Sequence, residues 1–314
     1  MRFSRMSALC GVLAALIMTS PLAAQEFRLN RTIETLESDA AVFGLFTANL
    51  SQQNARALAT SDLDFLFIDM EHSPFDVETL RTFLLGMLNV RQVAERGNPQ
   101  MAVTPLVRIP ANGRNDFDHI VKQVLDVGAF GVVFPFIESA EQAERAVRAM
   151  RYPARQGSPI AEPRGGRGSS PGIASWFWGV GDYSARADVW PLNPRGELLA
   201  VLQIESREGV ENIDAIAAVP GVGAIFVGPS DLSLSYGLPG SSPDVTNAIA
   251  RVLAVCIERD IPCGITTGSG SVAQRLAEGF KFVTIGYWSD AGISTEPGNA
   301  LGIGRRAAGR TGGN

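Results

Sequence analysis

The chain has 314 residues, of which 46% are hydrophobic and 8% aromatic, and its formal net charge at pH 7 is −5. This length and apolar content suffice for a full core, in one large α/β barrel or in two smaller domains. The mildly acidic charge, without a basic stripe carrying interleaved aromatic residues, excludes nucleic acid as an expected partner.

The first 24 residues are expected to form a cleavable signal peptide. Two arginines precede an apolar run over residues 6–18, and the small residues Ala23 and Ala24 close the segment. The run is too short to span a bilayer comfortably. We therefore expect a periplasmic or secreted protein with no stable membrane anchor after cleavage. Leu22, three residues before the cut, is an imperfect match, and a retained anchor is the alternative.

Eight strand-like runs then alternate with helical periodicity. The strands are predicted at 41–46, 65–69, 104–108, 131–135, 198–204, 224–227, 262–266 and 282–286. The helices are predicted at 52–60, 76–89, 116–127, 139–150, 209–219, 243–260 and 271–279. Eight repeated strand–helix units predict a closed (β/α)8 TIM barrel over residues 25–290, because closure leaves no sheet edge.

Two segments interrupt this rhythm. Residues 153–196 are long and rich in Gly, Pro and Ser, which is typical of a functional loop. Arg164 and Arg167 in this loop could line the entrance or contact a neighbouring subunit, and for either arginine alone a solvated loop is the simpler interpretation. Residues 291–314 form a tail with only a weak helical stretch at 300–308, and its last residues are expected to be disordered.

The cysteines leave two possibilities open. Cys10 would be lost with the signal peptide, while Cys256 and Cys263 lie seven residues apart. In an oxidising compartment these two could form a disulfide, although spacing does not reveal their geometry. Two buried free thiols are the alternative.

Two carboxylates stand at the ends of apolar strands. Glu205 directly follows the run at 198–204, and Asp231 follows the run at 224–227 by four residues. The carboxyl ends of parallel strands form the mouth of an α/β barrel, so the two acids would meet there. They would repel each other unless a cation lay between them, and oxygen ligands suit Mg²⁺ or Mn²⁺. Alternatively, each acid merely caps the helix that follows.

Three further charged residues are candidates for chemistry. His72 follows the second strand beside Asp69 and Glu71, and can act as a general acid or base near neutral pH, or simply support the helix that follows. Arg108 ends the third strand and could bind a carboxylate or an enolate oxygen, or form an internal ion pair. Asp126 could orient His72, but ending its own helix is the favoured role.

Other basic residues are given no catalytic role. His119 falls on a helix flank, and Lys122 and Lys281 fall in a helix and at the start of a strand. With no lysine at a strand end, a Schiff base is disfavoured and a metal-dependent mechanism is preferred.

Five motifs together resemble the HpcH/HpaI aldolase family, the class II pyruvate aldolases of the phosphoenolpyruvate/pyruvate-barrel group. The similarity covers about residues 30–290, and the motifs are IDMEHSPFD, LVRIP, VLDVGAFGVVFPFIESAEQAERAVRAMRYP, LQIESREGVENI and FVGPSDLSLSYG. The resemblance implies a divalent ion, Mg²⁺ or Mn²⁺ with Co²⁺ as a third option, bound by Glu205 and Asp231. Pyruvate would chelate this ion. Its carboxylate would lie against Gln203 and the turn formed by Gly228, Pro229 and Ser230.

The same resemblance implies the remaining catalytic roles. Arg108 matches the arginine that stabilises the enolate, and His72 matches the histidine that transfers the proton. Asp126 and Asp69 correspond to carboxylates associated with that histidine. A homo-oligomer, a trimer or a hexamer of paired trimers, is also implied.

The expected function is a lyase that cleaves or forms 4-hydroxy-2-oxo acids, with pyruvate as the common half and an aldehyde as the other. One alternative is an exported barrel that binds a metal and an oxo acid without turnover. A second is a related barrel enzyme acting on acyl-CoA or phosphonate derivatives. The chain departs from the family in its export signal, in the Gly/Arg/Ser-rich loop at 157–172 and in its tail, which replaces a closing helix exchanged between subunits.

Overall fold

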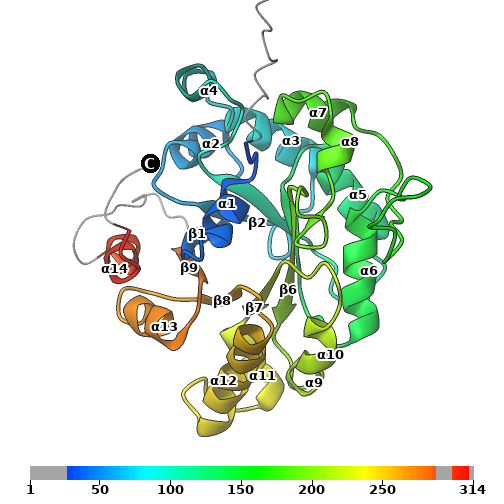
Figure 1. The fold of residues 1–314 in the computed structure, drawn as a ribbon. Coiled ribbons are helices and arrows are strands. Elements are labelled where there is room, and N and C mark those ends of the chain that lie inside the picture. The colour runs from blue at the N-terminus through cyan, green and yellow to red at the C-terminus, as the bar shows by residue number, and fades with distance from the viewer. Residues whose placement is uncertain (1–26, 288–298, 311–314) are drawn as a thin grey trace, which may run out of the picture.

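The computed structural model describes residues 27–287 and 299–310. Eight parallel strands pair in the order β1-β2-β3-β4-β6-β7-β8-β9, and β9 pairs back with β1, so the sheet closes into a barrel (Figure 1). Their bounds are β1 (Val42–Thr47), β2 (Phe65–Asp69), β3 (Thr104–Arg108), β4 (Gly131–Phe134), β6 (Leu198–Ile204), β7 (Ala224–Val227), β8 (Cys263–Thr266) and β9 (Phe282–Tyr287). The predicted (β/α)8 TIM barrel is confirmed.

Helices surround this barrel. They are α1 (Arg31–Glu37), α2 (Gln52–Ala59), α3 (Val77–Gly86), α4 (Val90–Arg96), α5 (Asp118–Asp126), α6 (Ala140–Met150), α7 (Gly172–Trp178), α8 (Tyr183–Arg186), α9 (Arg207–Glu211), α10 (Ile213–Ala217), α11 (Pro229–Tyr236), α12 (Pro243–Glu258), α13 (Val272–Glu278) and α14 (Ala300–Ala307). Below, the mouth is the end of the barrel where the strands finish, and the floor is the end where they begin.

The core follows from the strand sequences. Every residue of β2 and β6 is buried, as expected for strands covered on both faces. Inside the barrel the rings of Phe46, Phe67 and Phe226 pack edge to face, with centroids 5.0 Å apart for Phe46 and Phe67 and 5.3 Å apart for Phe67 and Phe226. The barrel is therefore a filled core, and chemistry is confined to its ends.

Strand positions agree with the sequence prediction to within one residue at each end, but several helices do not. Two helices, α9 and α10, stand where one was predicted at 209–219. Asn212 separates them, as the C-cap of α9 and the N-cap of α10, and its side chain donates to the Glu138 carbonyl (2.8 Å). The loop at 153–196 contains α7, α8 and a short strand β5 (Val189–Trp190) paired with β6. The helices α4 and α11 were not predicted.

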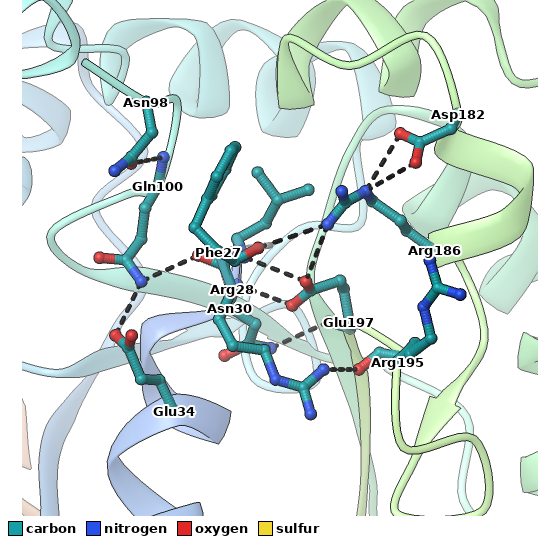
Figure 2. A network of polar contacts seen from close by, with 12 residues as sticks. Phe27, Arg28, Asn30, Glu34, Asn98, Gln100, Asp182, Arg186, Arg195 and Glu197 are labelled. Carbon is teal, nitrogen blue, oxygen red and sulfur yellow. Dashed lines mark hydrogen bonds and ion pairs between the residues drawn. The ribbon is translucent and has the colours of Figure 1, made fainter. Parts of the chain in front are cut away.

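The amino-terminal part of the described chain is fastened to the floor. Glu197, directly before β6, accepts hydrogen bonds from the backbone N–H of Leu29 (3.1 Å) and Asn30 (3.0 Å), and lies 3.6 Å from Arg186 (Figure 2). Arg28 donates to the carbonyl of Gly196 (2.9 Å). The buried carboxylate thus ties the segment leading into α1 to the start of a central strand.

The far end of the chain also joins the barrel. The weak helix predicted at 300–308 is α14, whose Leu301 is fully buried. A Cβ built on Gly304 would lie 2.5 Å from the Phe43 ring, so only glycine permits this contact. The predicted domain boundary at residue 290 and the signal peptide lie outside the described residues.

Two smaller findings concern the cysteines and the membrane. Cys256 and Cys263 are both buried and free, which corresponds to the second alternative for this pair. Within residues 27–287 and 299–310, each helix is too short or too polar to cross a membrane.

Candidate active site

Four strands deliver the predicted residues to the mouth. Asp69 ends β2 and Arg108 ends β3, and the two are direct neighbours in the parallel register. Glu205 follows β6, and β7 leads through Gly228 into α11, whose first turn contains Asp231. The barrel therefore brings together side chains that are up to 162 positions apart in the sequence, from Asp69 to Asp231.

Arg108 is held by two carboxylates. Its Nε and Nη2 donate to Asp69 Oδ1 and Oδ2 at 3.1 and 2.7 Å, and its Nη1 lies 3.1 Å from Glu71 Oε2. The guanidinium carbon lies 4.6 Å from the centroid of the Phe46 ring. The internal ion pair that was the alternative for Arg108 is thus formed, and it fixes the guanidinium at the mouth.

His72 stands at the rim of this cluster. Its side chain is 61% exposed, and its Nε2 lies 3.5 Å from Glu71 Oε2. Its backbone N–H donates to Asp69 Oδ1 (3.3 Å), which holds the turn after β2. Burial raises the pKa of Glu71, against the lowering effect of Arg108 and His72. Glu71, which the sequence prediction mentioned only as a neighbour, therefore links the histidine to the arginine.

Glu205 is a buried carboxylate with like charges beside it. Its Oε1 accepts from the backbone N–H of Phe136 (3.1 Å), and its Oε2 accepts from Gln203 Nε2. Burial, reinforced by the charges of Glu71 and Asp231, raises the pKa of Glu205 to about 8. Phe136 has φ +49°, a left-handed conformation that is rare for a bulky residue. This strained backbone conformation at Phe136 accompanies the hydrogen bond from its N–H to the Glu205 carboxylate.

The surroundings of Glu205 leave room for a polar ligand. A Cβ on Gly228 would lie 2.2 Å from Glu205 Oε2 and 3.0 Å from Gln203 Nε2, so a larger residue here would displace the carboxylate of Glu205. Gln203 is 2% exposed, and its Oε1 is buried with no hydrogen-bond partner in the described part of the chain. A buried acceptor without a partner is unfavourable, and it indicates an oxygen that an absent group would engage.

Neither acid acts as a helix cap. Ser206, not Glu205, caps α9 by accepting from Gly209 N (3.1 Å), and α11 has no side-chain cap. Among described residues, the carboxylate of Asp231 has no hydrogen-bond or ion-pair partner, although its charge acts on Glu205 and Glu71. The capping alternative therefore fails for both.

The donor set suits a hard divalent cation. It offers the carboxylates of Glu205 and Asp231 and the unpartnered amide oxygen of Gln203, all oxygen ligands in a negatively charged surrounding. In the described ranges, no group of three or more His, Cys, Asp or Glu side chains is placed to hold a metal ion. A cation here would thus take two carboxylates from the chain.

Asp126 is not part of this site within one chain. It is the last residue of α5, before β4 begins, and so lies at the floor end rather than at the mouth. Its Oδ1 accepts from Arg167 Nη2 (2.7 Å). The predicted orientation of His72 by Asp126 is therefore wrong for a single chain. The solvated-loop interpretation of Arg167 is also wrong, because its side chain is fully buried.

The comparisons with known proteins identify the family of the chain. The model of the HpcH/HpaI aldolase/citrate lyase family matches residues 42–294. The chain belongs to this family. A "5-keto-4-deoxy-D-glucarate aldolase" from Salmonella arizonae is 37% identical over 254 residues, covering 80% of this chain and 86% of the relative. Membership of the family and relatives of this kind make the protein an enzyme of the aldolase type, a carbon–carbon lyase.

Solved structures of the family have the same fold. A "HpcH/Hpal aldolase/citrate lyase family protein" from Burkholderia cenocepacia J2315 superposes with a TM-score of 0.69 at 33% identity, over 82% of this chain and 93% of that one. The "HpcH/HpaI aldolase" from Desulfitobacterium hafniense DCB-2 gives a TM-score of 0.65 at 25% identity, over 81% and 89%. The barrel described above is thus the family's barrel.

Proposed function

We propose that the protein is a divalent-metal-dependent aldolase that cleaves or forms 4-hydroxy-2-oxo acids, with pyruvate as the common half and an aldehyde as the other. One observation carries this proposal: Glu205 and Asp231 repel each other at the mouth beside an unpartnered oxygen of Gln203. The name of the Salmonella arizonae relative, which is an aldolase of an oxo sugar acid, supports the same substrate class.

Glu205 and Asp231 would hold the ion. A bound Mg²⁺ or Mn²⁺ supplies positive charge beside the oxygen that becomes an enolate, which stabilises that charge by several kcal/mol, on the order of what metal sites provide. Gln203 directs one N–H of its Nε2 at Glu205, and its Oε1 can accept a hydrogen bond from a hydroxyl or water. The pyruvate carboxylate would then accept from the second Nε2 N–H or from backbone N–H groups.

Those N–H groups lie at the start of α11. Pro229 has none, so Ser230 and Asp231 are the residues of the Gly228–Asp231 turn that can donate to the carboxylate. This assignment narrows the predicted binding turn: Gly228 provides the close approach, and Pro229 fixes the first helical residue.

His72 and Arg108 handle the reacting atoms. In the cleavage direction His72 takes the proton from the 4-hydroxyl, the C3–C4 bond breaks to release the aldehyde, and the electron pair moves to the C2 carbonyl oxygen as an enolate. Arg108, fixed by Asp69 and Glu71, donates to that oxygen. Return of that proton from His72 to C3, directly or through a water molecule, then gives pyruvate and restores the neutral imidazole.

An aldehyde panel tests the proposal. Purified protein lacking residues 1–24 is incubated with Mn²⁺, pyruvate and a set of aldehydes, and pyruvate consumption is followed with and without EDTA. We expect consumption with at least one hydroxyaldehyde, and its loss in EDTA. Pyruvate left untouched by every aldehyde would favour the alternative of a barrel that binds metal and oxo acid without turnover.

We also propose export to the periplasm or outside the cell, and a homo-oligomer. Residues 1–24 support the first proposal, and the family resemblance supports the second. Mass spectrometry of the amino terminus of protein recovered from a periplasmic fraction tests the first, since a cut after Ala24 leaves Gln25 as the first residue. Sedimentation velocity tests the second.

A further inference from the structure

Thr266, which the proposed function does not use, ends β8 at the mouth of the barrel. β8 is four strands away from β3 in either direction around the barrel, so Thr266 stands across the mouth from Arg108. The first three residues of β8 are buried, whereas Thr266 is exposed. Its hydroxyl is therefore open to a molecule bound at the mouth.

The side chain of Thr266 faces the inside of the barrel. Side chains of a strand alternate between the two faces of the sheet, so residues two apart share a face. Two positions earlier on β8, a Cβ built on Gly264 would lie 2.5 Å from the Phe226 ring, which belongs to the interior aromatic cluster. The register that pairs Phe226 with Gly264 also places Gly228 beside Thr266, one layer nearer the mouth.

This position adjoins the proposed metal site without belonging to it. A Cβ on Gly228 would lie 2.2 Å from Glu205 Oε2, so Gly228 borders that carboxylate. Neighbouring strands lie about 4.8 Å apart, which puts Thr266 one strand spacing beyond Gly228. A small molecule held at Glu205 and Asp231 would thus be within reach of the Thr266 hydroxyl.

The hydroxyl of Thr266 has a hydrogen to donate. Thr284 on β9 is fully buried, and its Oγ1 lies 3.1 Å from Thr266 Oγ1, its only hydrogen-bond partner among the described residues. A buried hydroxyl that donates to nothing is unfavourable, so Thr284 donates and Thr266 accepts. Because a hydroxyl carries one hydrogen and two lone pairs, Thr266 keeps its own hydrogen for a partner at the mouth.

The turn after β8 fixes this pair of threonines. Thr267 donates to the Thr284 carbonyl twice, from its backbone N–H (2.7 Å) and from its Oγ1 (3.0 Å). The backbone N–H of Gly268 then donates to Ser271 Oγ (3.1 Å), directly before α13. The Thr266 hydroxyl is therefore held on a rigid strand end, as a group that selects between ligands must be.

The proposed mechanism leaves one part of the substrate without a contact. It places the C2 oxygen at Arg108 and the 4-hydroxyl at His72, but assigns nothing to the carbon chain beyond C4. One side of the mouth, at β3, is taken by Arg108. The other side, at β8 and β9, offers Thr266 and has room, since a Cβ on Gly286 would meet no described atom within 4 Å.

We propose that Thr266 selects aldehydes that carry a hydroxyl on the carbon next to the carbonyl, by donating a hydrogen bond to that hydroxyl oxygen. The inference rests on the proposed function and narrows its aldehyde half to 2-hydroxyaldehydes. In the cleavage direction the same oxygen is the 5-hydroxyl of a 4,5-dihydroxy-2-oxo acid. Thr266 exchanges no proton with the substrate. It determines specificity because a substrate without this oxygen leaves its hydrogen unpartnered.

The test compares glycolaldehyde with acetaldehyde, which lacks only this hydroxyl, in the pyruvate assay with Mn²⁺. The measured quantity is the ratio of the two kcat/KM values. Thr266→Val keeps the shape of the side chain and removes the hydroxyl, so the ratio should fall about tenfold from its wild-type value, as expected for one lost hydrogen bond. Thr266→Ser retains the hydroxyl and should keep the ratio within about threefold of wild type.

Thr267→Val is the matched control. It is the same substitution in the same turn, but the hydroxyl that it removes binds the Thr284 carbonyl. It should cost stability as Thr266→Val does, while the ratio changes less than about twofold, because no contact with the aldehyde is lost. An unchanged ratio in Thr266→Val, or an equal fall in both variants, would overturn the proposal.

A binding measurement separates this inference from the aldolase proposal. 5-Hydroxy-2-oxopentanoate and 2-oxopentanoate have no 4-hydroxyl and so cannot undergo the aldol cleavage, and calorimetry with Mn²⁺ gives their Kd values. Thr266→Val should weaken binding of the hydroxylated acid about tenfold and leave that of 2-oxopentanoate unchanged. If wild type turns over no aldehyde but shows this difference, the aldolase proposal fails and the Thr266 contact stands. Equal effects on both acids, or no saturable binding of either, would contradict the contact whatever the activity.

Discussion

Strand β6 has a buried glutamate at each of its ends, and the two differ in what surrounds them. Glu197 and Glu205 are both 1% exposed, and burial raises the pKa of both. At the floor, two backbone N–H groups and Arg186 compensate Glu197 (Figure 2). At the mouth, Glu205 accepts one backbone N–H bond and one bond from the Gln203 amide. Two further carboxylates, Glu71 and Asp231, lie near enough to raise its pKa. The first carboxylate is satisfied within the chain, and the second stands among like charges that the ion of the proposed function would neutralise.

Replacement of the glutamate at the mouth should have the largest effect. Glu205→Gln keeps the shape but removes the charge, so Mn²⁺ binding should be lost and pyruvate release should fall by at least roughly 10³, the several kcal/mol that a metal site supplies. Asp231→Ala should behave likewise. Calorimetry with Mn²⁺ and a coupled pyruvate assay measure both quantities. Retention of more than a tenth of the activity would contradict a metal role for Glu205.

The histidine at the rim should affect turnover without affecting the metal. His72→Ala should lower kcat by roughly 10² to 10⁴, the usual contribution of general acid–base catalysis, while Mn²⁺ binding is unchanged. The control is His119→Ala, since the second histidine of the chain is exposed in the first turn of α5 and lines a groove on the outer wall of the barrel. Normal turnover in His72→Ala would remove this residue from the mechanism.

When metal is removed, the repulsion between Glu205 and its neighbouring carboxylates should make the free energy of unfolding depend on pH. The pKa of Glu205 is about 8 in the folded chain against 4.5 for an ordinary glutamate, so between these values the unfolded chain has released a proton that the folded chain retains. The free energy of unfolding in EDTA should therefore fall as pH rises from 5 to 8, by an amount on the order of a few kcal/mol.

Urea unfolding at several pH values measures this slope. Glu71 and Glu197 contribute in the same direction because their pKa values are also raised, so the contribution of Glu205 is the difference between wild type and Glu205→Gln. Mn²⁺ should flatten the slope in wild type only. An identical slope in the variant would mean that Glu205 ionises normally.

The same contrast explains what the sequence could and could not predict. The apolar runs that precede Glu205 and Asp231 were enough to predict β6, β7 and the position of both acids, because strand burial and strand direction are local properties of the sequence. The partners that satisfy a buried charge are not local. Arg167 is in a loop that reads as solvated, yet it is buried against Tyr152 and Tyr183, and Asp126 belongs to that floor-end cluster.

The sequence predicted helix boundaries less accurately than strand boundaries, for a related reason. The break at Asn212 depends on a contact with the Glu138 carbonyl, 74 positions away, and no pattern within 209–219 reveals it. Glu71 was likewise visible only as a neighbour of His72, because its role depends on how Arg108 reaches across from β3. Long-range pairing, and not local propensity, decided these points.

At the floor, the expected effect is on stability alone. Glu197→Gln replaces one carboxylate oxygen by an amide, so the N–H of Leu29 or Asn30 loses its acceptor, and the free energy of unfolding should drop by about 1–3 kcal/mol. Activity per folded molecule should not change. Glu37→Gln is the control, since this glutamate, 38% exposed, should contribute less than about 1 kcal/mol. Lost activity in folded Glu197→Gln would mean that the two ends of β6 are coupled.

The smallest effect concerns how the mouth holds Glu205 in position. Ser206 follows this glutamate and caps α9 through Gly209 N (3.1 Å), while Ser242 caps α12 in the same way through Val245 N (3.4 Å). Either serine changed to alanine should cost about 1 kcal/mol of stability. Only Ser206→Ala should also lower kcat/KM, by less than tenfold, because only this cap adjoins the carboxylate. Equal kcat/KM in the two variants would mean that the hydrogen bonds from Phe136 and Gln203 suffice to hold Glu205.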